Sequence, residues 1–205
     1  MEEKEKEPLQ LIFKWRYCFG RHVKALLGHQ SQRTTDRLLS KLVEDGLLER
    51  KRILYGYPSL YCLTIKGKKK VGAKPIKEGI RIERIKHDAT ILDTLPRFIE
   101  KFDVELGCVL SERDLKSFDK YSQGHIPDFA IIKNNEEVWT VEYELTLKAL
   151  HRLKFNVVSN YIRFDKQIWV IPRYQVKLFV LLHELKEEYS NIEVVILEDL
   201  YSTSL

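Results

Sequence analysis

Two apolar runs that meet at a short polar turn constrain the fold of this chain most strongly. The runs cover residues 128–133 (DFAIIK) and 137–145 (EVWTVEYEL), and the dipeptide Asn134-Asn135 between them is typical of a tight turn. The spacing predicts an antiparallel β-hairpin. Because side chains alternate along a strand, the register of this hairpin decides which side chains share a face.

Three carboxylates share one face of the expected hairpin. A register centred on the turn sets Asp128 opposite Glu142, and Glu144 follows on the same face. Like charges so close repel each other unless cations neutralise them, and Mg²⁺ prefers carboxylate oxygens as ligands. Glu112 lies at the end of the first expected strand, just beyond its last residue, and Lys148, expected one turn into the following helix, could reach the patch. The candidate metal ligands are Asp128, Glu142 and Glu112, and the candidate catalytic residues are Asp128, Glu142, Glu144 and Lys148.

The same acid patch also has a purely structural interpretation. Lys148, Arg152 or Arg113 could neutralise the carboxylates in an internal salt-bridge cluster. Acids at the ends of strands are also common residues that face solvent. The residue pattern leaves the metal site and the salt-bridge cluster as open alternatives.

Charge is divided unevenly along the 205 residues, whose net charge is +5. Residues 1–75 carry 17 Lys or Arg and 8 Asp or Glu, a net charge of +9, whereas residues 76–205 carry 18 and 22, a net charge of −4. Four of the early acids lie at 1–8, which we expect to be a disordered acidic tail. The strong positive charge of residues 1–75 favours a polyanion as partner. A lysine-rich surface that only faces solvent would have the same composition and is the alternative.

The composition excludes several classes of protein. With 44% hydrophobic residues the chain can form a packed core, so disorder throughout is excluded. No apolar run approaches the roughly 18 residues of a membrane helix, and the first residues lack the apolar segment of a signal peptide. The three cysteines are scattered, which argues against a zinc cluster or a disulfide framework. We expect a cytoplasmic protein without a membrane partner.

The pattern of residues 9–73 predicts three helices followed by a β-hairpin, the order of a winged helix. Gly28 is expected to end the second helix, and Ser31 to cap the start of the third. The third would then be the recognition helix, which enters the major groove of DNA. These elements are helices over 9–19, 21–27 and 32–44 and strands over 47–54 and 59–63.

The outward face of helix 32–44 carries side chains that bond phosphates and base edges. Arg33 and Arg37 lie one turn apart and could both be phosphate anchors. A winged helix that docks a protein is the alternative interpretation of the same pattern. The candidate DNA-binding residues are Ser31, Gln32, Arg33, Thr35, Arg37, Ser40 and Lys41 of the helix and Arg50, Lys51, Arg52 and Tyr57 of the hairpin.

A second domain is expected over 81–205, after a linker at 71–80 that contains two glycines and a proline. The fold class is α+β or α/β, with helices on both sides of a mixed sheet in the order αβββαβαβ. Pro96 should kink or split the first of these helices. The expected helices span 81–102, 146–163 and 176–189, and the expected strands span 104–110, 128–133, 137–145, 167–171 and 192–197.

The hairpin "PDFAII…VWTVEYE" in an αβββαβ frame resembles the PD-(D/E)XK nuclease-like fold, also called restriction-endonuclease-like. The resemblance implies that Asp128 and Glu142 bind Mg²⁺, and that a lysine two residues after the glutamate helps to activate water. Glu144 occupies that lysine position in this chain. Lys148 is therefore the candidate to substitute for it from the next helix.

From about Leu9 to Ile171 the chain is also similar to the replication-relaxation family of mobile-element proteins. The resemblance implies a DNA-binding accessory or regulatory protein in the replication or mobilisation of a plasmid or conjugative element. An active metal-dependent endonuclease or nickase and a transcriptional repressor are the alternatives. The expected partners are double-stranded DNA, a second copy of the chain, and replication or relaxase proteins of the same element. The matching stretches are "FKWRYCFGRHVKALLG", "RLLSKLVEDGLLERKRI", "YCLTIKGKK", "HDATILDTL", "SERDL", "PDFAII", "VEYELTLKALHRL" and "NYIR".

Overall fold

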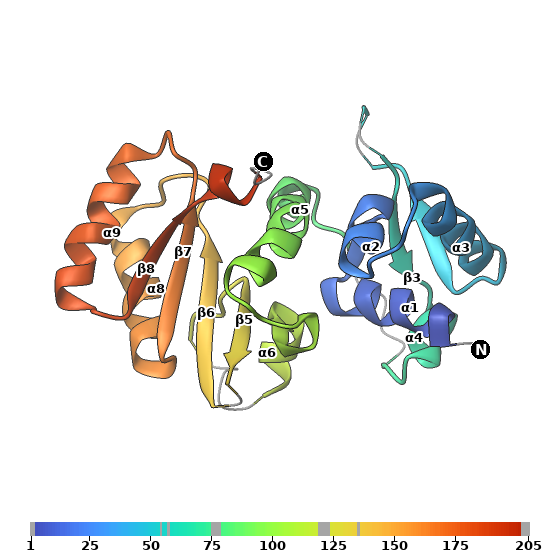
Figure 1. The fold of residues 1–205 in the computed structure, drawn as a ribbon, viewed down its shortest axis with the longest axis horizontal. Helices are drawn as coiled ribbons and strands as arrows, with labels where there is room; N and C mark the ends of the chain where they lie inside the picture. Colours follow the sequence, from blue (N-terminus) through green and yellow to red (C-terminus); the bar gives the residue numbers. More distant parts are fainter. Residues whose placement is uncertain are drawn as a thin grey trace. The chain divides into compact units, whose positions relative to one another are not determined.

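The computed structural model describes residues 3–53, 55–56, 58–74, 79–118, 124–134 and 136–201. Its contacts divide the chain into two compact units, residues 1–96 (unit 1) and 97–205 (unit 2), whose elements are labelled in Figure 1. The fold belongs to the α+β class. Within the described ranges, no helix is both long and apolar enough to cross a membrane.

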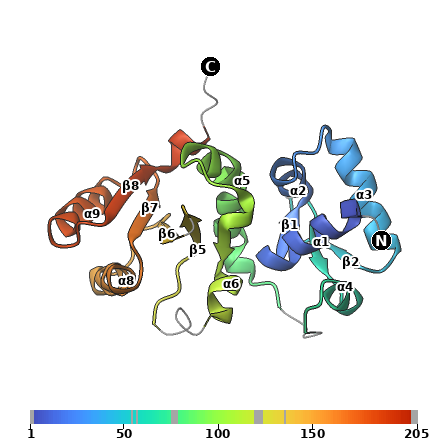
Figure 2. The same ribbon diagram turned by 60° about the horizontal axis from the view of Figure 1, so that its bottom comes forward.

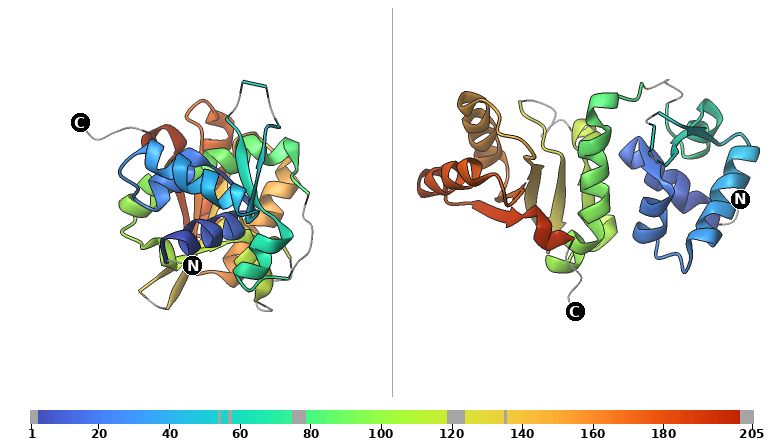
Figure 3. Two further views of the ribbon diagram at one scale, coloured as in Figure 1. Left: turned by 90° about the vertical axis from the view of Figure 1, so that its right-hand side faces the viewer. Right: turned by 90° about the horizontal axis from the view of Figure 1, so that it is seen from above.

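Unit 1 combines helices with a three-stranded antiparallel sheet, in which the strands are ordered β1-β3-β2. The β2–β3 hairpin pairs Leu48 with Leu63 and Lys51 with Leu60. Figure 3 shows this hairpin beside helix α3. The elements are α1 (Glu3–Trp15), β1 (Tyr17–Phe19), α2 (Gly20–Leu26), α3 (Gln32–Glu44), β2 (Leu48–Lys51), β3 (Leu60–Leu63), α4 (Ile65–Lys70), a 3-10 turn (Ile82–Arg84) and the first part of α5 (Ile85–Lys101).

Helix α3 forms where the residue pattern predicts it. The Ser31 hydroxyl accepts a hydrogen bond from the Thr34 amide at 3.1 Å and so caps the helix start. Leu39 and Leu42 are fully buried and attach one face of the helix to the core of unit 1. After the helix, Gly46 adopts a φ of +69°, a backbone conformation that favours glycine.

The beginning of the chain differs from the sequence prediction. The pattern predicts a disordered segment at 1–8 and one helix over 9–19. Residues 3–8 instead belong to a helix, residues 1–2 lie outside the described residues, and the helix ends at Trp15, four residues early. Helix α1 already begins at Glu3; its first turns contact the rest of unit 1 through the ion pair of Glu5 with Lys41 and through buried Leu9. Arg16, with a φ of +69°, then turns the chain into β1, which hydrogen-bonds to β3. A strand of only three residues carries too little periodicity to be distinguished from a helix by sequence alone.

The first half of α5 packs with unit 1. Ile85 and Ala89 share an apolar cluster with Tyr17 of β1 and Leu60 of β3. The contact-based division of the chain therefore lies beyond the linker expected at 71–80. Pro96 does not split this helix, which runs as one element from Ile85 to Lys101.

Unit 2 contains a five-stranded mixed sheet in the order β4-β5-β6-β7-β8. Strands β4, β5 and β6 pair antiparallel, and β6, β7 and β8 pair parallel. The expected order of helices and strands is present. Helix α6 is added within residues 111–127, a segment that the residue pattern predicts to be irregular. The elements after α5 are a 3-10 turn (Leu106–Cys108), β4 (Val109–Ser111), α6 (Glu112–Ser117), β5 (Phe129–Lys133), β6 (Glu137–Tyr143), α8 (Leu150–Arg163), β7 (Lys166–Ile171), α9 (Val176–Glu188), β8 (Ile192–Ile196) and a 3-10 turn (Leu197–Leu200).

The register of the β5–β6 hairpin is the predicted one. Phe129 pairs with Val141, and Ala130 pairs with Thr140. Residues that pair directly lie on the same face of a sheet, so Phe129 and Val141 share one face and Ala130 and Thr140 share the other. Glu142 is two residues after Thr140 on β6, and alternation along the strand therefore places it on the same face as Thr140.

The two faces of this sheet are covered by different helices. Figures 1 and 2 show α8 and α9 together on one face. Their buried side chains, including Val157 and Leu182, form a cluster with Trp169 of β7. On the other face, Phe98 from the end of α5 meets Phe129 of β5, with the ring centroids 5.3 Å apart. Since Glu142 pairs with Trp169 in the sheet, its face is the one under α8 and α9.

Candidate functional site

The outward face of α3 forms a shallow surface groove. Arg33 and Arg37 are exposed, as is Ser40. Within the described residues, neither arginine forms an ion pair, so both guanidinium groups are available to a ligand. Two acids, Asp36 and Glu44, also face this groove. Its lining consists of Arg33, Asp36, Arg37, Ser40, Lys41 and Glu44.

Two of the candidate lysines already have acidic neighbours. Lys41 Nζ lies 2.5 Å from a Glu5 carboxylate oxygen, and this hydrogen bond lowers the pKa of Glu5. Lys51 Nζ lies 3.1 Å from Glu49, whose hydrogen bond raises the pKa of Lys51. A phosphate would have to compete with these carboxylates for either ammonium group.

Thr35 is not on the outward face, and its prediction as an exposed DNA-binding residue is wrong. The side chain is fully buried, with its hydroxyl 3.2 Å from the Ser31 carbonyl and 2.9 Å from His29 Nδ1. The reason is helical geometry, because a residue four positions before buried Leu39 lies on the same side of the helix.

The remaining DNA-binding candidates have different surroundings. Ser31 caps α3, and Gln32 donates a hydrogen bond from its side-chain amide to Asp36 at 2.8 Å. Arg50 and Arg52 are exposed on and just after β2. Tyr57 lies outside the described residues.

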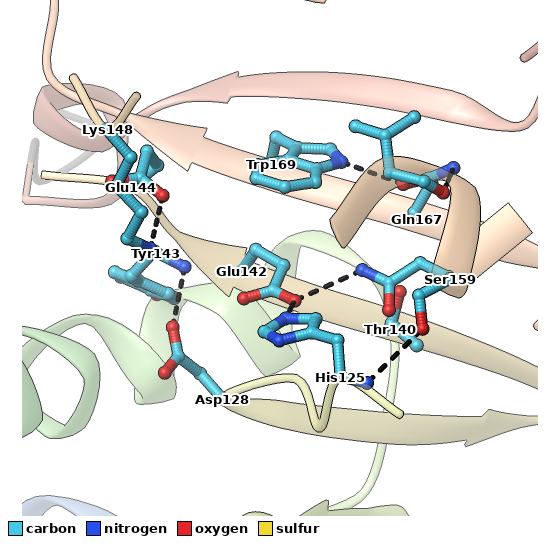
Figure 4. A network of polar contacts seen from close by, with 12 residues as sticks. His125, Asp128, Thr140, Glu142, Tyr143, Glu144, Lys148, Ser159, Gln167 and Trp169 are labelled. Carbon is cyan, nitrogen blue, oxygen red and sulfur yellow. Dashed lines mark hydrogen bonds and ion pairs between the residues drawn. The ribbon is translucent and has the colours of Figure 1, made fainter. Parts of the chain in front are cut away.

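Glu142 lies on β6 of the hairpin in unit 2, and Asp128 lies directly before β5, one residue outside the strand in which it was expected. An Asp128 carboxylate oxygen accepts a hydrogen bond from the Tyr143 amide at 2.9 Å. Figure 4 shows Asp128, Glu142 and Glu144 along this pair of strands, each beside a different partner. The sequence therefore identified the acid-bearing segment correctly, and the partners decide its chemistry.

Glu142 is buried and receives two hydrogen bonds on one carboxylate oxygen. The donors are His125 Nε2 and Asn160 Nδ2, the latter at 3.1 Å (Figure 4). Arg163 holds His125 in turn, because its guanidinium donates to the His125 carbonyl. Burial lowers the pKa of Arg163, and the negative charge of Glu142 opposes that shift.

Glu144 is 2% exposed and pairs with Lys148, whose Nζ lies 2.5 Å away. Burial raises the pKa of Glu144; the ion pair with Lys148 opposes this, and the neighbouring charges of Glu142 and Asp128 add to it. Lys148 reaches the patch as expected, but from the loop before α8 and not from one turn inside the helix. The expected helix start at 146 is therefore too early.

Glu112 does not contribute a fourth acid in the way its prediction requires. It lies at the start of α6 and pairs with Lys116 on the same helix. Among the residues that the structure describes, no group of three or more His, Cys, Asp or Glu side chains is arranged to hold a metal ion. Of the counter-charges that the salt-bridge interpretation named, Lys148 pairs with Glu144, whereas Glu142 and Asp128 accept hydrogen bonds from His125, Asn160 and the Tyr143 amide.

Sequence reasoning missed the residues that surround Glu142. His125 lies in the segment expected to be irregular, and Asn160 lies on α8. A signal was present in α8, because Asn156 and Asn160 are buried beside Leu153 and Val157. Polar residues at helical spacing on a buried face must find polar partners inside the protein.

Comparisons with known proteins do not assign the chain to a family. No family model matches the chain, and no curated protein matches it significantly.

Proposed function

We propose that the protein binds double-stranded DNA through unit 1, with α3 as the recognition helix of a winged helix and the β2–β3 hairpin as its wing. The element order α1-β1-α2-α3-β2-β3 and the strand order β1-β3-β2 support this topology. The observation that carries the proposal is the pair of exposed arginines, Arg33 and Arg37, one turn apart on the outward face of α3 and without ion pairs among the described residues.

The cations of this surface suit a phosphate backbone. Arg50 and Arg52 extend the positive charge from α3 onto the adjoining hairpin. Guanidinium groups donate several parallel hydrogen bonds, which match the oxygens of a phosphate. Four such contacts would release about four condensed counterions, so DNA affinity would depend steeply on salt.

The biological setting of the proposal rests on the resemblance to replication-relaxation proteins. In that setting the protein is an accessory or regulatory factor in the replication or mobilisation of a plasmid or conjugative element. Unit 1 would bind the DNA site. Unit 2 would contribute to the assembly of a protein complex on the DNA or would make further contacts with the DNA. The internally paired carboxylates of unit 2 favour such a role over catalysis.

We expect the affinity for a labelled 30-base-pair duplex to fall steeply with salt. Four phosphate contacts predict a slope of roughly −3 to −4 in a plot of the logarithm of the association constant against the logarithm of salt concentration. Fluorescence anisotropy with the full chain from low to moderate salt measures this slope. Absence of binding at low salt, or an affinity independent of salt, would reject DNA as the partner.

A second candidate function is that of a metal-dependent DNA endonuclease or nickase. It is favoured by one arrangement. Asp128, directly before β5, accepts a hydrogen bond from the amide of Tyr143, which follows Glu142 on β6, and a displaced lysine, Lys148, reaches the neighbouring Glu144. In such an enzyme, Mg²⁺ would activate water and stabilise the leaving oxygen. The hydrogen bonds from His125 and Asn160 to Glu142 compete with this use of the carboxylate.

Nicking of a supercoiled plasmid separates the two candidates. With Mg²⁺ or Mn²⁺, we expect the wild-type chain to produce no more nicked plasmid than the Asp128→Asn, Glu142→Gln double variant, because each carboxylate is engaged within the protein. The conservative substitutions keep similar side-chain volumes, so that loss of folding does not mimic loss of catalysis. Metal-dependent nicking that disappears in the double variant would assign the endonuclease activity instead.

A further inference from the structure

We propose that Asp36, held by Gln32, reads a base edge in the major groove and selects a base with an exocyclic amino group, cytosine or adenine. The inference deepens the proposed DNA-binding function and rests on it. It assigns a specificity-determining role to an acid that lies among the cations of the α3 groove.

The side chains of Gln32 and Asp36 form a fixed pair on α3. Gln32 Nε2 donates to Asp36 Oδ1 at 2.8 Å across one helical turn. Both residues lie in the N-terminal half of the helix, the part that a recognition helix presents to base edges. Asp36 is exposed, and within the described residues its second carboxylate oxygen has no hydrogen bond, so that oxygen can accept one from a ligand.

Gly20 at the start of α2 allows the pair to lie against the body of unit 1. A Cβ atom at this position would come within 3.0 Å of Gln32 Nε2 and 3.4 Å of Asp36 Oδ1. Because Gly20 has no side chain, the Gln32 amide has room beside the start of α2, and the hydrogen bond from Gln32 restricts the orientation of the Asp36 carboxylate. A hydrogen-bonding group of restricted orientation discriminates between ligands better than a freely rotating one.

The position of Asp36 joins the two parts of the proposed DNA surface. Besides the α3 groove, it lines a second cavity of about 320 Å³. Arg50 of β2 and Tyr61 of β3 form part of the wall of that cavity. A nucleotide contacted by both α3 and the hairpin would therefore pass beside the carboxylate.

The charge of Asp36 explains which base it would select. A carboxylate repels phosphate, so beside Arg33 and Arg37 it lowers the affinity for DNA of any sequence. An ionised carboxylate only accepts hydrogen bonds, and in the major groove the donors are the amino groups N4 of cytosine and N6 of adenine. Guanine and thymine offer only acceptors at the same strand position and would leave the carboxylate unpaired.

Selection of binding sites from a random duplex library tests the proposal. The full-length wild-type chain should enrich a motif with cytosine or adenine at one strand position, and replacing that base pair by its reverse should weaken binding about tenfold. The Asp36→Ala chain should lose this preference and bind random duplex about threefold more tightly, because one repulsive charge is gone. Glu44→Ala is the matched control, since it removes an acid from the same groove but near the helix end.

The possible results distinguish base selection by Asp36 from the proposed binding of duplex DNA by unit 1. The inference is supported if Asp36→Ala loses the preferred position while Glu44→Ala keeps it. An Asp36→Ala chain that enriches the same motif with the same preference overturns it, as does a wild-type chain that binds duplex without any sequence preference. Absence of wild-type binding to any duplex rejects the DNA-binding function itself.

Discussion

Replacing Arg33 and Arg37 together by alanine is expected to weaken duplex binding about 10- to 100-fold at 0.1 M salt. The two guanidinium groups are exposed on one face of α3, and no ion pair within the described residues occupies them. Each lost phosphate contact removes about 0.9 from the salt slope, so the double variant should have a slope shallower by about two. The same anisotropy titration used for the wild-type chain measures the affinity and the slope together.

Structural damage is a small concern for this double variant, because alanine is the strongest helix former and neither arginine is buried. A matched control removes two exposed cations from α8 of unit 2, Arg152→Ala and Lys154→Ala. That control should retain wild-type affinity within about twofold. If both double variants lose affinity equally, the general charge of the protein and not the α3 surface is responsible.

Replacing Lys148 by methionine is expected to lower the free energy of unfolding by about 2 kcal/mol at pH 8. The change leaves Glu144, which is 2% exposed, without its cation. An unpaired buried carboxylate costs several kcal/mol, and the partial exposure of Lys148 reduces the effect. Urea or guanidinium unfolding of the wild-type and variant chains at several pH values measures the difference.

The decrease in the free energy of unfolding caused by Lys148→Met should become larger as pH rises. Burial raises the pKa of Glu144 above its ordinary value near 4.5, so the folded chain binds this proton more tightly than the unfolded chain does. The contribution of the group to stability is therefore greatest below that ordinary value and is lost as pH rises through the raised pKa. Without Lys148 the pKa rises further, so the defect should be large at pH 8 and shrink toward pH 4.

Two comparisons make the result specific to this ion pair. Lys116→Met removes the cation of the Glu112 pair on α6, where both side chains are more exposed, and should cost less than about 0.5 kcal/mol. Combining Lys148→Met with Glu144→Gln should remove most of the pH dependence, since the amide does not ionise. A Lys148→Met defect of the same size at pH 4 and pH 8 would contradict the assignment to Glu144.

The sequence by itself determined the elements whose signals are local. Helix α3 has its cap at Ser31 and its apolar stripe within one stretch of chain, and the structure contains that helix with the predicted bounds. The β5–β6 hairpin was equally predictable, because a turn signal centred on position 135 and period-two alternation together define the pairing of Ala130 with Thr140. Neither prediction required knowledge of a distant residue.

The tertiary structure alone decided which partners these elements meet. His125 and Asn160 come to Glu142 from a loop and a helix on opposite sides of the hairpin in sequence, so no spacing rule could identify Glu142 as their shared partner. By contrast, helical spacing from Leu39 places Thr35 on the buried side of α3, and Lys148 is only four residues from Glu144; for that pair the structure adds the burial of the carboxylate and the approach from the loop before α8. The physical reason is that burial and charge neutralisation depend on contacts between distant segments, whereas caps, turns and periodicity depend on neighbours along the chain.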